Sequence, residues 1–325
     1  MLRMVMAGLL VSLGALAPAA AQDEARDFPN RAIRIVVPFP AGGPADVASR
    51  LLGQKMSEDW GQPVVIENRV GANTVIGAQQ VGKAAPDGYT LLMAIDSTLT
   101  MNQYLYRTPP YDPFNDFVPI TLTAKSLVFM YVNAASDYRS MKEIIAAAKA
   151  QPGKLNYATA GTGSATHMAL ERFRFAAGFE VLNVHTKGAG EALTEVVAGR
   201  ADCYFALVFQ AQKMKDSGKV DAHLVSGPKR SALMPSLPTT EEAGYRGSAY
   251  NFWLGTLVAA KTPRPIVERL AKEINALVQS PEISGRIVKL GADPLTLSIS
   301  EFQAMIDREL KENAELIRKA GIKAN

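Results

Sequence analysis

Short apolar runs alternate with amphipathic helical patterns along almost the whole chain, and this alternation limits the fold more than any other feature. Each run ends in a loop rich in Gly or Pro, and a helical pattern follows most of them. The runs in question lie at 33–39, 64–67, 86–95, 154–160, 180–186 and 201–209. Repeated strand–loop–helix units are typical of α/β proteins with mostly parallel sheets. The series restarts after residue 140, which indicates two lobes.

The course of the chain between the lobes follows from the segments outside these series. Residues 116–134 read as two buried strand pieces around Lys125-Ser126. After a strand that begins near residue 250, only helical patterns follow, which we expect to pack on the first lobe. We therefore predict a first lobe of residues 22–125 and 248–325, and a second lobe of residues 126–247.

The first 21 residues form a separate unit. Arg3 precedes an apolar stretch over 4–16, and Ala19–Ala21 form a cleavage site of the A-x-A type. We interpret 1–21 as a secretory signal peptide, which is not part of the mature fold. The alternative is an uncleaved anchor. No later segment reaches 18 uninterrupted apolar residues, so we expect the mature chain to be soluble.

Charge and cysteine content exclude several classes of function. The chain has 35 Lys and Arg against 31 Asp and Glu, a net charge of +4. The basic residues are scattered, whereas nucleic-acid binding calls for a dense basic patch, so we expect no nucleic-acid partner. Cys203 is the only cysteine, which rules out an intramolecular disulfide, and its apolar surroundings favour a buried side chain.

The stretch VVPFPAGGPADVASRL, residues 36–51, predicts an anion-binding loop. An apolar run ends at Pro40, Gly42 and Gly43 follow, and Pro44 occupies the expected first position of a helix. The spacing fits neither a P-loop nor a dinucleotide fingerprint, so a carboxylate is a better ligand than a nucleotide. Free N–H groups of the first helical turn suit such a ligand, and Asp46 could complement the helix dipole. The alternative is that the glycines only make a tight turn.

Two loops in the second series repeat the pattern. ATAGTGSATH (158–167) and HTKGAGEAL (185–193) both run from a strand through glycine into a helix. Loops after parallel strands gather at the carboxyl ends of a sheet, where α/β proteins bind ligands. Two facing lobes would place Gly42 and Gly43 opposite Gly161, Gly163 and Ser164. This arrangement predicts a cleft for a small anion.

Motifs for catalysis or metal binding are missing from the sequence. His167, His185 and His223 lack metal-ligand spacing. Ser164 is not in a nucleophile elbow, because both 162 and 166 are Thr. We therefore expect no enzyme activity, no cofactor and no metal. The alternative is a secreted hydrolase that uses Ser164 or His167.

Several segments together resemble the substrate-binding proteins of tripartite tricarboxylate transporters, also called Bug-type solute receptors. They include RAIRIVVPFPAGGPADVASRL, VVIENRVGANTVIGAQQV, PDGYTLLMA, YDPFNDFVPI, PGKLNYATAGTGSATHMALERF and LPTTEEAG. The resemblance implies a two-lobed Venus-flytrap fold, similar to type II periplasmic binding proteins, with two crossover strands. It further implies a periplasmic receptor, which we expect to be a monomer, that delivers a carboxylate to a two-component membrane permease. A receptor that presents its ligand to a membrane sensor kinase would have the same fold.

The resemblance also implies which residues bind the ligand. In the first lobe they are Phe39, Ala41, Gly42, Gly43, Asp46 and Ser97. In the second lobe they are Ala160, Gly161, Gly163, Ser164, Thr186, Lys187, Gly188, Ala206 and Leu207.

Two segments depart from the usual family pattern. The family usually has His-Val-Pro-Tyr-Lys-Gly where this chain has NVHTKG, with Asn183, His185 and Thr186 in place of His, Pro and Tyr. It usually has ENRPGAGG where this chain has Val70 for the Pro and Asn73-Thr74 for the last two glycines. These changes leave the identity of the acid open, and a bulkier or less common acid becomes plausible.

Overall fold

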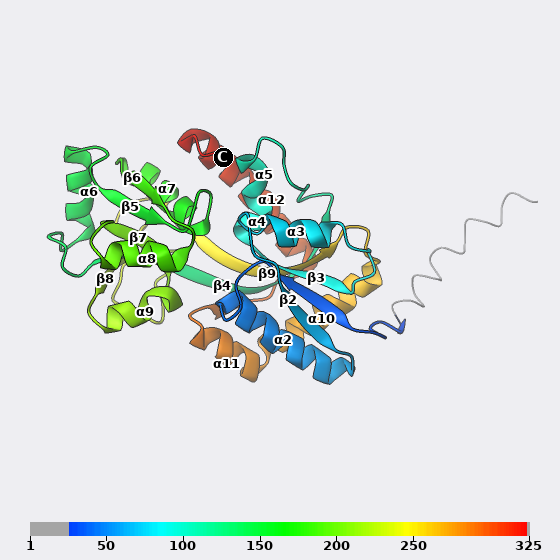
Figure 1. Cartoon of the computed structure of the whole chain (residues 1–325). Coiled ribbons are helices and arrows are strands. Elements are labelled where there is room, and N and C mark those ends of the chain that lie inside the picture. The colour runs from blue at the N-terminus through cyan, green and yellow to red at the C-terminus, as the bar shows by residue number, and fades with distance from the viewer. Residues whose placement is uncertain (1–25, 324–325) are drawn as a thin grey trace, which may run out of the picture.

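The computed structural model describes residues 26–323, which form two α/β lobes joined by two long strands (Figure 1). The predicted signal peptide, 1–21, lies outside the described residues. One lobe contains β1 (Ile33–Val37), α2 (Pro44–Trp60), β2 (Val64–Asn68), α3 (Val75–Gly82), β3 (Thr90–Ile95), α4 (Asp96–Thr100) and α5 (Asn102–Leu105). The other contains α6 (Met141–Ala150), β5 (Asn156–Thr159), α7 (Ala165–Ala177), β6 (Leu182–His185), α8 (Ala189–Val197), β7 (Cys203–Leu207), α9 (Val208–Asp216) and β8 (Val220–Ser226).

Strands β4 (Phe117–Asn133) and β9 (Asn251–Ala259) connect the lobes. After β9 the chain continues through α10 (Arg264–Gln279), α11 (Pro281–Lys289), β10 (Asp293–Pro294) and α12 (Ile299–Ala320). The exact boundaries predicted for the two lobes stay a prediction. None of the helices within residues 26–323 is both long and apolar enough to cross a bilayer.

The strand directions make the carboxyl ends of the parallel strands in the two lobes face each other. The strand order is β2-β1-β3-β9-β4-β7-β5-β6. Strands β1, β2 and β3 are mutually parallel, and β3 and β4 are both antiparallel to β9, so β4 runs in the same direction as β1, β2 and β3. Strands β5, β6 and β7 are parallel to one another, and β7 is antiparallel to β4. Because β4 leads from the first lobe into the second, the carboxyl ends of both parallel sets point toward the boundary between the lobes.

The prediction of two strand pieces around Lys125-Ser126 is wrong, because β4 is one continuous strand of 17 residues. Lys125 and Ser126 pair with Trp253 and Phe252 of β9, and from Val128 onward β4 pairs with β7 and β8. Ser126 Oγ donates a hydrogen bond of 3.0 Å to a backbone carbonyl of the α11–β10 connection. The polar pair therefore marks the point where the strand changes partners rather than its end.

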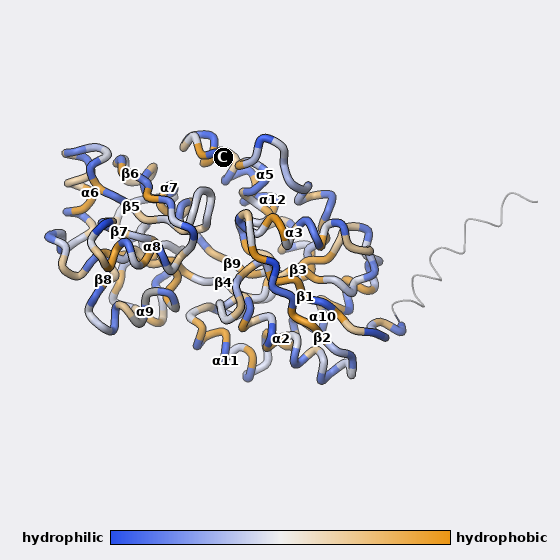
Figure 2. The backbone as a smooth tube through the Cα atoms, viewed as in Figure 1, coloured by the Kyte–Doolittle hydropathy of each residue, from blue (hydrophilic) through white to orange (hydrophobic). Residues whose placement is uncertain are grey.

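Each lobe has its own apolar core between its sheet and its helices. In the first lobe, Ile33 and Ile35 of β1 pack with Leu52 and Met56 of α2. In Figure 2, hydrophobic colour is frequent in the strands and alternates with hydrophilic colour along the helices. This is the pattern expected where amphipathic helices cover a sheet whose strands are buried on both faces.

Helix α12 spans the two lobes, which the sequence does not predict. Helices α10 and α11 pack on first-lobe elements, as expected. The first half of α12 also packs there, with Phe302 against Trp253 at a ring-centroid distance of 5.3 Å. Its second half contributes Leu316 and Ile317 to the core that contains Phe173 of the second lobe. The last helix is therefore a structural link between the lobes, in addition to β4 and β9.

Candidate functional site

The loop after β1 has the geometry that the sequence predicts. Gly42 has φ +80°, a conformation that favours glycine, and Gly43 is the N-cap of α2 with no side-chain capping bond. A Cβ added at Gly42 would meet nothing within 4 Å, and one at Gly43 would meet only Pro40 O at 3.4 Å. Open space therefore lies beside both glycines, next to the first turn of a 17-residue helix.

Asp46 organises this loop from within. Its side chain is 2% exposed, and Oδ2 accepts hydrogen bonds of 2.9 Å from Gly42 N–H and from Arg50 Nε. Asn68 Nδ2 donates to Asp46 Oδ1 and to Phe39 O, both at 2.9 Å. Burial raises the pKa of Asp46, but the hydrogen bonds from Arg50, Gly42 and Asn68 outweigh it and hold the pKa below its ordinary value. The carboxylate is thus engaged inside the protein, while Phe39 is half-buried and Ala41 is exposed.

The loop after β5 is held by reciprocal capping at the start of α7. Ser164 is the N-cap, and its Oγ accepts from His167 N–H at 3.3 Å. His167 Nδ1 in turn accepts from Gly163 N–H at 3.0 Å. This arrangement resembles a capping box, except that a ring nitrogen replaces the carboxylate oxygen and accepts from the residue before the N-cap. It gives the Gly-x-Gly-Ser-x-x-His pattern a structural cause, and it places His167 in a positioning role.

His167 is neutral in this environment. Its side chain is 3% exposed, and burial, followed by the neighbouring His185 and Arg174, lowers its pKa to about 3. Because Nδ1 accepts the Gly163 hydrogen bond, the assigned tautomer carries its proton on Nε2. The ring is therefore a hydrogen-bonding brace rather than a base at neutral pH.

The loop after β6 begins next to the Gly161 loop. Thr186 Oγ1 lies 2.9 Å from the carbonyl oxygens of Thr159 and Gly188. A Cβ added at Gly161 would meet Thr186 O at 3.4 Å, whereas one at Gly188 would meet nothing within 4 Å. Lys187 is exposed.

In the atypical NVHTKG segment, His185 Nδ1 lies 2.7 Å from Thr159 Oγ1, so this side chain is tied to β5. Partial burial of the ring lowers the pKa of His185.

The remaining predicted contacts differ in what they offer a ligand. Ser97 is fully buried, and its Oγ has no hydrogen-bond partner within residues 26–323. The Ala206 side chain is packed in the second-lobe core, which leaves its backbone. Leu207 lines a small apolar cavity together with Pro44, Lys125 and Phe252. This cavity brings the first-lobe loop, both connecting strands and the end of β7 to one place. Ala160 is half-buried, and its N–H donates to Thr166 Oγ1 at 3.0 Å.

Among residues 26–323, metal-ligating side chains form no cluster, and Ser164 and His167 have their own hydrogen-bond partners. Within 26–323, no three His, Cys, Asp or Glu side chains are grouped so as to bind a metal ion. Ser164 Oγ is bonded to the backbone of His167 and lies 3.0 Å from Thr166 Oγ1, while the His167 ring is engaged with Gly163. Cys203 is buried, and burial raises the pKa of its thiol. The Ser164 and His167 side chains are therefore both engaged in hydrogen bonds at the start of α7.

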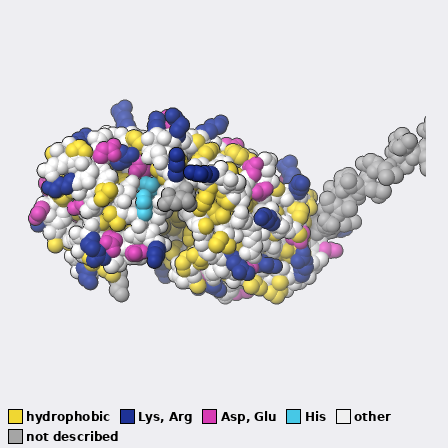
Figure 3. Space-filling view, turned by 45° about the horizontal axis from the view of Figure 1, so that its top comes forward, with side chains coloured by type: hydrophobic (Ala, Val, Ile, Leu, Met, Phe, Trp, Pro, Cys, Tyr) yellow, Lys and Arg dark blue, Asp and Glu magenta, His cyan; other side chains and the backbone are white. Residues whose placement is uncertain are grey.

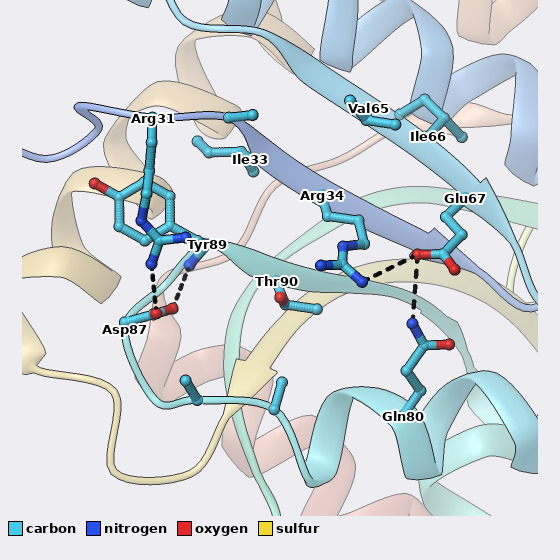
Figure 4. A pocket seen from close by; sticks show the side chains of 13 residues that line it. Arg31, Ile33, Arg34, Val65, Ile66, Glu67, Gln80, Asp87, Tyr89 and Thr90 are labelled. Carbon is cyan, nitrogen blue, oxygen red and sulfur yellow. Dashed lines mark hydrogen bonds and ion pairs between the residues drawn. The ribbon is translucent and has the colours of Figure 1, made fainter.

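A larger groove of about 670 Å³ lies on the first lobe, away from these loops (Figure 4). It is lined by the beginnings of β1 and β3, by β2 and by the end of α3. Its charges are paired: Arg31 contacts Asp87 at 2.7 Å, and Arg34 contacts Glu67 at 3.4 Å. Figure 4 shows both pairs on the groove wall, so the groove offers an anion no free cation among its lining residues.

On the face shown in Figure 3, basic and acidic side chains are interspersed rather than gathered.

Comparison with known proteins identifies relatives over nearly the whole chain. A family model described as "Tripartite tricarboxylate transporter family receptor" matches residues 48–322. The chain is 36% identical over 291 residues to the UPF0065 protein in the tcbD-tcbE intergenic region of Pseudomonas sp. (strain P51), covering 89% of this chain and 85% of that protein. It is 31% identical over 324 residues to Protein BugT of Bordetella pertussis, covering 98% and 99%.

Solved structures with the same fold include ligand complexes. The periplasmic binding protein BugD superimposes with a TM-score of 0.80 at 32% identity, over 92% of this chain and 100% of that one. Rpa4515 of R. palustris, solved with adipate, gives 0.83 at 30% identity, over 91% and 99%. MatC of Rhodopseudomonas palustris, solved with bound malate, gives 0.77 at 28% identity, over 89% and 100%. The predicted fold class, a two-lobed periplasmic binding protein, is confirmed.

Proposed function

Because the chain belongs to the family of tripartite tricarboxylate transporter receptors, we propose that it captures a small organic carboxylate between its lobes and delivers it to a two-component membrane permease. The ligand leaves chemically unchanged. The protein works as a monomer in the periplasm, to which the signal-peptide pattern at 1–21 directs it.

The observation that carries this proposal is the convergence of the two sets of strands. The carboxyl ends of β1, β2 and β3 point toward those of β5, β6 and β7, so the glycine loops of both lobes meet the same boundary. Space beside Gly42, Gly43 and Gly188 lets a ligand approach the backbone closely. Helix N-termini supply N–H donors and a favourable dipole for a carboxylate. The relatives solved with adipate and malate support a carboxylate as the ligand class.

The contacts divide into direct and supporting ones. We infer direct contacts from the backbone of Ala41, Gly42, Gly43, Gly161 and Gly188 and from the unpartnered Ser97 hydroxyl. Asp46 and Ser164 act through the loops that they order. The remaining residues of the proposed site, for which we infer no direct contact, are Phe39, Ala160, Gly163, Thr186, Lys187, Ala206 and Leu207. Closure then stabilises the ligand-bound state by the difference in affinity between the open and closed forms.

A thermal-shift screen tests the proposal. The mature protein is unfolded, dialysed to remove any copurified acid, refolded and mixed with adipate, malate, citrate and benzoate. A ligand at 100 times its Kd adds about 2.7 kcal/mol of stability, which raises the midpoint by several degrees. Dimethyl adipate and dimethyl malate are the matched controls, because they keep the carbon skeleton without the charges. The absence of any shift with a broad panel of mono-, di-, tri- and aromatic carboxylates would overturn the proposal.

A further inference from the structure

The loop that enters α3 has an unusual backbone. Gly71, Ala72, Asn73 and Thr74 have φ values of +140°, +48°, +49° and +76°. Three consecutive residues with side chains therefore lie in the left-handed region, which Cβ sterics disfavour in L-residues and which Asn tolerates best after Gly. Such a conformation persists only where the surrounding structure imposes it.

A polar network that starts from the buried side chains of Thr98 and Asn102 holds this conformation. Asn102, which is fully buried, donates a hydrogen bond of 2.7 Å from Nδ2 to Asn73 O. Tyr106 O–H donates to Ala72 O at 3.2 Å, and Thr74 Oγ1 lies 2.8 Å from Thr98 Oγ1. These bonds fix the backbone of the loop from the α4–α5 side. They therefore also fix the direction in which the Asn73 side chain leaves it.

That side chain reaches the other lobe. Asn73 Nδ2 donates to Asn102 Oδ1 at 2.9 Å and to Gly163 O at 3.4 Å. Gly163 belongs to the second-lobe loop that also contains Gly161 and Ser164. The same residue is packed against Leu105, since an added Cβ would lie 2.1 Å from Leu105 Cδ1. Asn73 and Leu105 of the first lobe therefore both contact the second-lobe loop at Gly163.

We propose that Asn73 is a positioning residue that sets where the Gly161–Ser164 loop stands relative to the first lobe, and thereby sets ligand affinity without touching the ligand. The proposal rests on the proposed function, because it takes this loop to be part of the carboxylate site. It explains why this position has an Asn in the left-handed conformation, since the side chain contacts the other lobe. It also gives Gly163 a role in contact between the lobes, in place of direct ligand contact.

The test compares Asn73→Gly with Ala72→Gly. Both changes relieve the strain of a positive φ, but only the first removes the hydrogen bond to Gly163. Spin labels are placed on cysteines that replace Lys142 of α6 and Arg264 of α10, one exposed site on each lobe, and the distance distribution is measured without ligand. Cys203 is buried and stays unlabelled in the folded protein.

We expect Asn73→Gly to shift the distribution, with about a five-fold change in the ratio of the open form to the closed form, as the loss of one hydrogen bond implies. Its thermal midpoint stays within a few degrees of wild type, because the strain relieved offsets the lost bond to Asn102 Oδ1. Ala72→Gly keeps the wild-type distribution. A wild-type distribution in Asn73→Gly would overturn the inference, and so would an equal shift in both variants.

Affinity for a carboxylate is a second readout. If wild type binds adipate, Asn73→Gly should bind it about five-fold more weakly, while Ala72→Gly binds it normally. The two proposals fail differently. A wild type that binds no carboxylate overturns the proposed function, whereas unchanged label distances overturn the role of Asn73.

Discussion

Arg172 of α7 donates a hydrogen bond of 2.9 Å to Asn313 Oδ1 of α12, and the same Asn313 side chain donates from Nδ2 to Thr100 Oγ1 at 2.8 Å. Arg172 lies in the second lobe and Thr100 in the first, so one amide that is 2% exposed joins both. Together with the split packing of α12, this shows that the last helix is bonded to and packed against both lobes.

Asn313→Ala tests this link. The change removes both hydrogen bonds, one of them to a charged guanidinium, and we expect it to lower the free energy of unfolding by about 2–3 kcal/mol. Urea denaturation measures the effect. Glu315→Ala on the same helix is the control, because its ion pair with Lys319 is exposed and should cost less than about 0.5 kcal/mol. Equal, small losses in both variants would show that Asn313 does not carry the link.

Asp96 should make stability depend on pH. It is buried beside Tyr250, whose hydroxyl hydrogen-bonds to it, and burial raises its pKa to about 7. Between about pH 4 and pH 7 the folded protein therefore binds a proton that the unfolded chain releases. The stability that this bound proton contributes is present below about pH 4 and is lost as the pH rises toward 7. The free energy of unfolding then falls by up to about 1.4 kcal/mol per pH unit. The unfolding free energy of Asp96→Asn minus that of wild type, measured by urea denaturation at several pH values, should increase as the pH rises from about 4 to about 7. A difference that does not change with pH would contradict the assignment.

His167 should act with the opposite sign. Burial lowers its pKa to about 3, so the unfolded chain binds the extra proton between about pH 3 and pH 6.5. Its contribution to stability is present above about pH 6.5 and is lost as the pH falls. His167→Asn keeps an acceptor for Gly163 N–H but cannot titrate. The unfolding free energy of this variant minus that of wild type, measured by urea denaturation at several pH values, should fall as the pH rises. If this difference instead rises with pH, as expected for Asp96→Asn, the prediction is refuted.

The elements that the sequence predicts well are those whose signal is local. Ile33–Val37 and Cys203–Leu207 are apolar runs, and Pro44 and Gly178 mark helix ends by their own backbone preferences. The continuity of β4 is missed because Lys125-Ser126 interrupts the apolar pattern at the crossing, where Ser126 has a polar partner. The periodicity of apolar residues alone does not distinguish such a crossing from a loop.

The residues that join the lobes give no local signal. Asn73 meets a residue 90 positions away, and Asn313 meets one 141 positions away. Each is a single polar residue whose role depends on the tertiary arrangement. Only the departure of Asn73 from the family's usual glycine points to it in the sequence, and the purpose of that departure becomes clear from the contact with Gly163. The glycine loops, in contrast, were predictable because a strand, a glycine and a helix occur together in sequence.

Gly43→Val tests whether the loop after β1 is one wall of the ligand site. Gly43 has φ −77° and ψ 165°, which any residue adopts, and an added Cβ would meet only Pro40 O at 3.4 Å. The fold should therefore tolerate valine, with a thermal midpoint within a few degrees of wild type. Binding of whichever carboxylate gives the largest shift in wild type should be lost, because the side chain fills the space through which a carboxylate reaches the backbone. Isothermal titration calorimetry measures this.

Gly285→Ala is the matched control for that variant. It adds a methyl group where nothing lies within 4 Å, on an exposed position of α11, and should bind the same acid with wild-type affinity. Because alanine favours a helix over glycine by about 1 kcal/mol, its stability should rise slightly. Wild-type affinity in Gly43→Val would mean that Gly42 and Gly43 only form a tight turn, and the ligand would then have to lie elsewhere along the boundary between the lobes.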